Sequence, residues 1–183
     1  KIISNANISD KLIFVLVALF PLSAVIGNLF INLTFIILFI IFIAEIFLKK
    51  NYFFLKDITF WIIVFFFSTL LINFYFSIDQ MNSLTRVLKI LLMITFTIQL
   101  KQIIQKYPKA FEEIIFKSWS IILSVILIDV VFEIIFGFNI TGIKSSYPGR
   151  ISSFFGDEHI VGGFFLGFGI FYISQISLLL KKY

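Results

Sequence analysis

Long apolar runs separated by short polar breaks make up most of this chain. The first run covers residues 12–48 and, as one helix, would be roughly 55 Å long, whereas the hydrocarbon core of a bilayer is about 30 Å thick. We expect it to fold back at Gly27-Asn28, because both residues are poor helix formers. The pattern predicts an all-α membrane protein with one transmembrane domain over residues 1–183. Its six expected transmembrane helices lie near residues 12–27, 29–48, 58–76, 84–104, 114–136 and 160–180, and its outer loop covers residues 137–159.

The distribution of lysine predicts the orientation of these helices. Positively charged residues in short loops mark the cytoplasmic side of a membrane. If the N-terminus lies inside the cell, most lysines fall on the inner side, so both termini are expected to be cytoplasmic. The abundance of Ile, Phe, Lys and Asn suggests an AT-rich bacterial genome. Four cations are left facing out: Arg86, Lys89, Lys144 and Arg150.

The composition excludes several other classes of protein. Hydrophobic residues make up 60% of the chain and charged residues 14%, whereas about a quarter of the residues of a soluble domain are charged. The net charge of +5 lies at the ends of apolar runs, so no nucleic-acid partner is expected. With no cysteine and one histidine, His159, no zinc site can be completed. We therefore expect a lipid bilayer as partner and no metal or other cofactor.

The two arginines of the chain, Arg86 and Arg150, both fall on the predicted outer side. Arginine grips phosphate or carboxylate with a rigid pair of donors, which lysine cannot do. Arg86 shares a helix face with Lys89, and the acidic pair Asp129 and Glu133 shares a face of the next helix at matching depth. Two interpretations remain open: interhelical ion pairs, or a polar cavity in which the cations bind an anionic head group.

The predicted outer loop contains the densest group of charges, with Arg150, Asp157, Glu158 and His159 within ten residues. The acidic residues could contribute to a polar site. They could equally be ordinary N-terminal charges of the last helix, where the helix dipole favours acids. The glycines that follow, with the spacing Gly163-x-x-x-Gly167, are expected to let another helix approach closely.

The stretch that begins at Arg150 resembles a motif of the O-antigen polymerase and O-antigen ligase family of bacterial inner membranes. Members of that family often show Arg-x-Ser-Gly-x-Phe-Gly-Asp-Glu followed by a glycine that leads into a helix. Ser153 replaces the usual glycine here, and His159 stands where an aliphatic residue is more common. The helix opening SLTRVLKILL and the Pro21 to Gly27-Asn28 hairpin are also similar to the first half of the family. The residues that match in register are Arg150, Ser152, Phe155, Gly156, Asp157, Glu158 and Gly162.

The resemblance implies glycan transfer on the periplasmic face, with an undecaprenyl-pyrophosphate-linked oligosaccharide as donor and outward-facing arginines on its pyrophosphate. It implies pyrophosphate binding by Arg150 and Arg86 and no metal, and other polysaccharide-assembly membrane proteins are candidate partners. Together with the polar groups near these arginines, the expected substrate-binding residues are Arg150, Arg86, Lys89, Asp157 and Glu158, and no catalytic residue is assigned. Family members usually carry about twice as many helices, so the chain is expected to be the N-terminal part of such an enzyme. Two alternatives remain: a transporter or permease fragment, and a non-catalytic membrane subunit.

Overall fold

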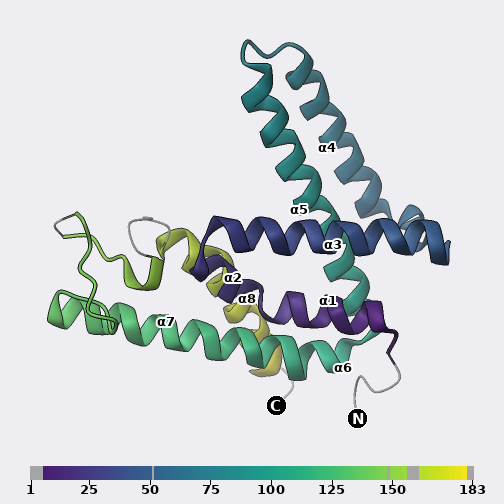
Figure 1. The fold of residues 1–183 in the computed structure, drawn as a ribbon. Coiled ribbons are helices and arrows are strands. Elements are labelled where there is room, and N and C mark those ends of the chain that lie inside the picture. Colours follow the sequence, from purple (N-terminus) through teal and green to yellow (C-terminus); the bar gives the residue numbers. More distant parts are fainter. Residues whose placement is uncertain (1–5, 51, 148, 156–160, 181–183) are drawn as a thin grey trace. The chain divides into compact units, whose positions relative to one another are not determined.

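The structure is a computed structural model that describes the chain except for residues 1–5, 51, 148, 156–160 and 181–183 (Figure 1). Every regular element among the described residues is helical. The longer helices coincide with the predicted apolar runs. In chain order the elements are α1 (Ile8–Ala18), α2 (Phe20–Ile26), α3 (Asn28–Lys49), η1 (Phe53–Lys56), α4 (Ile58–Tyr75), α5 (Gln80–Lys106), α6 (Pro108–Ala110), η2 (Phe111–Phe116), α7 (Lys117–Phe136), η3 (Ser153–Phe155) and α8 (Val161–Leu180).

Four helical stretches in the described chain are long and apolar enough to cross a membrane: α3, α4, α5 and the continuous helix Pro108–Phe136. The bent pair α1 and α2 makes a fifth if it counts as one span. A shorter apolar stretch, Val161–Ile170, lies within α8. These helices are those of a membrane protein, and a break is present at Gly27, where the fold-back was predicted, since this glycine ends α2 with a φ of +128°.

The first predicted helix is broken, with a bend of 49° between α1 and α2. Pro21 lies in the first turn of α2 and has no N–H to donate to the carbonyl of Val17 one turn earlier. The indole Nε1 of Trp119 on α7 donates to that carbonyl instead, at 2.8 Å. The neighbouring carbonyl of Ala18 accepts from the Ser118 hydroxyl at 2.8 Å. Side chains of α7 thus supply the donors that the break removes, as a helix in lipid requires.

The chain divides into two compact units. The first consists mainly of residues 3–13 and 32–108, and the second consists mainly of residues 14–31 and 109–183. In the first unit α4 and α5 lie side by side as a hairpin. Lys106, at the end of α5, pairs with the Asp10 carboxylate at 2.7 Å, and the Tyr107 hydroxyl donates to the same carboxylate oxygen at 2.8 Å. These contacts tie the end of α5 to α1.

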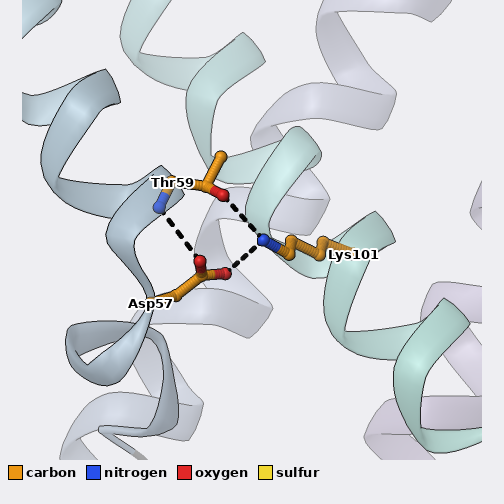
Figure 2. Close-up of polar contacts among 3 residues, drawn as sticks. All are labelled: Asp57, Thr59 and Lys101. Atoms are coloured by element: carbon orange, nitrogen blue, oxygen red, sulfur yellow. Dashed lines mark hydrogen bonds and ion pairs between the residues drawn. The ribbon is translucent and has the colours of Figure 1, made fainter.

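A second polar contact joins α4 to α5 in the first unit (Figure 2). Asp57 caps α4 by accepting from the Thr59 amide at 3.0 Å, and its other oxygen pairs with the Lys101 ammonium at 2.5 Å. Lys101 also donates to the Thr59 hydroxyl at 2.8 Å. The ammonium of Lys101 is the main reason why the pKa of Asp57 lies below its ordinary value, with the Thr59 amide second. One carboxylate thus caps one helix and holds the next.

Candidate functional site

The second unit is organised by a single buried stripe along α7. The buried residues of this helix follow one another at intervals of three or four, so they share one face. The first part of the stripe is apolar, and its Leu123 and Ile126 form a hydrophobic core with Phe155 and Phe164. The last two positions are acidic, and both carboxylates are buried, with Asp129 0% and Glu133 5% exposed. The full stripe is Trp119, Leu123, Ile126, Asp129 and Glu133.

Glu133 binds the far end of the loop that follows α7. Its two oxygens accept from the backbone amide of Ser152 at 3.1 and 3.2 Å, and one of them accepts from the amide of Ser153 at 2.6 Å. The Ser152 hydroxyl contacts the same carboxylate at 3.3 Å. Two successive amides that point at one anion form a backbone nest, an arrangement that favours negative charge. The carboxylate therefore fixes the backbone of this segment as well as its side chain.

Asp129 binds both arms of the same loop. One oxygen accepts from the Ile140 amide at 2.7 Å, and the other accepts from the Ser153 hydroxyl at 2.6 Å. Asn139, which is 1% exposed, joins the two arms by donating its side-chain amide to the Ser153 carbonyl at 2.8 Å. Its own side-chain oxygen accepts from the Ile143 amide at 2.8 Å. We call Asp129, Glu133, Asn139, Ser152 and Ser153 the loop latch.

The latch holds Ser153 in a conformation that side chains seldom adopt. Its φ is +48°, in the left-handed region that glycine enters without steric cost and other residues enter at about 1–2 kcal/mol. Two hydrogen bonds offset this cost: the Ser153 hydroxyl donates to Asp129, and the Ser153 backbone amide donates to Glu133. This local strain accompanies the tight turn that brings two neighbouring amides to one carboxylate.

Arg150 lies two residues before the latch and is exposed. Its backbone amide donates to the Tyr147 carbonyl at 3.2 Å, and its guanidinium carbon lies 5.7 Å from the centre of the Tyr147 ring. This is within the distance at which a cation is attracted to an aromatic ring. The loop therefore presents a guanidinium at the surface next to a backbone that the latch holds in place.

The other predicted site residues are distributed over the two units. Arg86 and Lys89 are exposed on α5 in the first unit, whereas Asp129 and Glu133 belong to the second. The two carboxylates take hydrogen-bond donors from their own loop, and their pairing with Arg86 and Lys89 stays a prediction. Asp157, Glu158 and His159 lie outside the described residues. Among the described residues, no group of three potential metal ligands comes together.

The close helix contact expected at the α8 glycines is not borne out by the described residues. A Cβ added at Gly163 or Gly167 would meet no other atom within 4 Å, and the same holds for Gly162 and Gly169. Among the α8 side chains that pack on the core, Phe164 is buried, and its ring centre lies 5.2 Å from that of Phe155. Ring packing, not glycine packing, thus joins this helix to η3.

Sequence patterns do not reveal the role of Asn139, and they place Ser152 only in the family motif. Asn139 begins an Asn-x-Thr triplet, which suggests a surface position, yet its side chain is buried. No protein-family model, curated protein or solved structure matches the chain. The function is therefore inferred from the residues and their geometry.

Proposed function

We propose that the chain is the N-terminal part of a glycosyltransferase that faces the periplasm and resembles O-antigen polymerases and ligases. Its donor is an oligosaccharide linked to a lipid pyrophosphate, used in the assembly of a surface polysaccharide. The proposal includes six membrane spans, both termini in the cytoplasm, and the bacterial inner membrane. The lysine distribution supports this orientation, because most lysines then lie on the cytoplasmic side. In the same orientation both arginines lie on the outer side.

The observation that carries the proposal is the exposed guanidinium of Arg150 beside the loop latch. When an acceptor hydroxyl attacks the anomeric carbon of the donor sugar, the bond from that carbon to the pyrophosphate oxygen breaks. Negative charge then grows on the leaving pyrophosphate. A cation held in advance where charge develops lowers the barrier without reorganisation at the moment of reaction. The latch fixes Ser152 and Ser153, so the backbone next to Arg150 is already in place.

The conformation of Ser153 supports the resemblance of the motif. The similar family usually has glycine at this position, and the φ of +48° at Ser153 is one that glycine favours. A serine is acceptable here because its hydroxyl bonds to Asp129. The departure from the motif therefore has a specific compensation in this chain.

One observation favours a second candidate, a transporter or permease. Helices broken within the membrane often form transporter substrate sites, and α1 and α2 are broken at Pro21. The carbonyls at this break, those of Val17 and Ala18, are occupied by Trp119 and Ser118. The break is thus stabilised by packing on α7, which favours a structural role for it over a substrate site.

Binding of a polyprenyl pyrophosphate to the purified chain in lipid nanodiscs tests the proposal. We expect Arg150→Lys to weaken binding about 10- to 100-fold, because the charge remains but the bidentate grip is lost. Lys144→Arg, a change at a neighbouring exposed cation, is the matched control and should leave the affinity within about twofold. Equal affinity of the wild type and Arg150→Lys would rule out this arginine as the pyrophosphate ligand.

The cellular counterpart is complementation of a polymerase- or ligase-deficient bacterial strain with the gene. The wild type should restore glycan assembly, and Arg150→Lys should reduce it by two to three decades in rate, equivalent to about 2–4 kcal/mol of transition-state stabilisation. Immunoblots must show equal protein levels. Full assembly by Arg150→Lys would contradict the proposal.

A further inference from the structure

We infer that the loop after α7 (residues 137–147 and 149–155) is folded back into the surface layer of the bilayer. Its lipid-facing side chains are Ile140, Ile143 and Tyr147, and its cations meet the phosphates of the lipid head groups. This inference concerns the position of the loop and does not rest on the proposed glycosyltransferase activity.

The position of the latch along α7 gives the depth of the loop. The continuous helix that ends at Phe136 begins at Pro108, but its first third contains Lys109, Glu112, Glu113 and Lys117. The part that crosses the hydrocarbon core is therefore α7, whose 20 residues span about 30 Å, close to the thickness of the core. Asp129 and Glu133 precede its last residue, Phe136, by about two turns and one turn. Around the same turns the other faces expose large apolar side chains, which places these turns among lipid chains. The exposed residues are Leu127, Ile128, Val131, Ile134 and Ile135.

The latch prevents the loop from extending away from this depth. Asp129 holds the Ile140 amide near the start of the loop, and Glu133 holds the amides of Ser152 and Ser153 near its end. Backbone that is not helical is tolerated at membrane depth only where protein covers its polar groups. The covering is present where the latch binds, because Ser152 and Ser153 are both 0% exposed, whereas residues 140–144 are exposed. The latched parts of the loop thus meet the condition for backbone at membrane depth, and the exposed part between them fits the head-group layer, where water and head groups can satisfy its polar groups.

The exposed side chains of the loop have the chemistry of a membrane surface. Ile140, Ile143 and Tyr147 are each more than half exposed, at 52%, 55% and 54%. The described part of the loop contains Lys144 and Arg150 and no acidic residue, and Asp157 and Glu158 of the predicted loop lie outside the described residues. Apolar side chains with adjacent cations fit acyl chains and phosphates, and tyrosine is enriched where the two meet. This charge complementarity favours phospholipid over another protein as the occupant of the surface.

Site-directed spin labelling can measure the depth of the loop directly. The chain has no cysteine, so each introduced cysteine is the only labelling site. Nitroxides at Ile140→Cys and Ile143→Cys are measured in vesicles of phosphatidylethanolamine and phosphatidylglycerol. The readout is the ratio of the collision rates with oxygen, which enriches in lipid, and with a water-soluble nickel chelate. Ile128→Cys on the exposed face of α7 gives the lipid reference, and the exposed Glu113→Cys gives the water reference.

We expect both loop labels to give ratios closer to the Ile128 reference than to the Glu113 reference. In the background of Asp129→Asn with Glu133→Gln, the loop labels should shift toward the water reference while the Ile128 label remains in lipid, which shows that the helix is still inserted. Water-like ratios in the wild type would overturn the inference. Protection from both reagents would also overturn it, because protein would then cover the surface. Lipid-like ratios that survive the double substitution would refute the latch as the element that holds the loop.

Discussion

Glu133 of α7 accepts hydrogen bonds from the amide of Ser152 through both of its carboxylate oxygens, although the two residues lie 19 positions apart in the chain. A carboxylate at membrane depth is costly unless its oxygens are satisfied. Here the donors are backbone amides of the loop. Because these hydrogen bonds satisfy the buried carboxylate, they stabilise the conformation in which the loop packs on α7. The loop that carries Arg150 is therefore positioned by a residue of the helix that precedes it.

Removal of the Glu133 charge should weaken this attachment. Glu133→Gln keeps one acceptor oxygen and places an amide donor next to the Ser152 and Ser153 amides, which leaves at least one buried donor unsatisfied. We expect the unfolding free energy to fall by about 1–3 kcal/mol. Thermal unfolding in detergent is the measurement. Glu113→Gln, at an exposed position of the same continuous helix, is the control. Equal effects of the two substitutions would show that Glu133 does not hold the loop.

The strained conformation of Ser153 predicts an unusual order of stability. Both Ser153→Ala and Ser153→Gly lose the hydrogen bond from the hydroxyl to Asp129. The alanine must still adopt the strained left-handed φ, whereas glycine adopts it without steric strain. We expect Ser153→Gly to be more stable than Ser153→Ala by about 1 kcal/mol, the reverse of the order in a helix. Denaturation of both variants under the same conditions measures this difference. A more stable alanine variant would mean that the residue is not in the left-handed region.

The break in the first helix predicts energetic coupling between Pro21 and Trp119. Trp119→Phe leaves the Val17 carbonyl without its donor, at a cost of about 1–3 kcal/mol in addition to the lost packing. Pro21→Ala restores an amide that can donate to that carbonyl, so it should reduce the cost of Trp119→Phe. A double-mutant cycle measures the coupling. Trp61→Phe, which removes the indole bond to Leu55 on an exposed face, is the control and should show no coupling to Pro21→Ala.

The contact between Asp57 and Lys101 predicts a stability difference that depends on pH. The pKa of Asp57 is lowered, chiefly by Lys101, so its contribution is present above the ordinary aspartate pKa of about 4 and is lost as the pH falls through the lowered value. Asp57→Asn keeps a good helix cap but removes the charge. We therefore expect the wild type to be more stable than Asp57→Asn at pH 7 and at pH 5, with the difference fading below about pH 4.

A pH series of thermal unfolding measures this difference. In a Lys101→Gln background, the substitution Asp57→Asn should lose most of its pH-dependent effect on stability, since the lysine is the main cause of the lowered pKa. If the stability difference between the wild type and Asp57→Asn disappeared between pH 7 and pH 5, the group whose titration causes the difference would not be Asp57.

The sequence could predict the helices but not the partners of the buried acids. Long apolar runs leave few alternatives to helices in lipid, and the break at Gly27 was predicted because the run is too long for one span and Gly27-Asn28 is poor in helix propensity. For Asp129 and Glu133, charge complementarity pointed to Arg86 and Lys89. Backbone amides occur at almost every position of a chain, so nothing in the sequence distinguishes those that will meet a carboxylate.

Pro21 is an interior proline of the predicted helix 12–27, where a kink or break is expected, and the structure shows a bend of 49° there. The donor that Trp119 supplies at this bend, and the role of Phe164, required the structure. The spacing of Gly163 and Gly167 suggested close helix packing, but spacing cannot show whether a second helix is present on that face. Arg150 was predicted from its chemistry and from the motif that it begins; the structure shows it exposed two residues before the latch, and its role in a site stays a prediction.

Hydrogen–deuterium exchange at the amides of Ser152 and Ser153 tests the central claim most directly. Both amides lie outside the long helices, yet both donate to the Glu133 carboxylate and are buried. In vesicles we predict exchange at least about 100-fold slower than for an unstructured peptide, a factor equivalent to about 2.7 kcal/mol of protection. In Glu133→Ala the protection of these two amides should be lost, while that of the α7 amides remains. Exchange at the unstructured rate in the wild type, or equal protection in Glu133→Ala, would contradict the account of a loop held by this carboxylate.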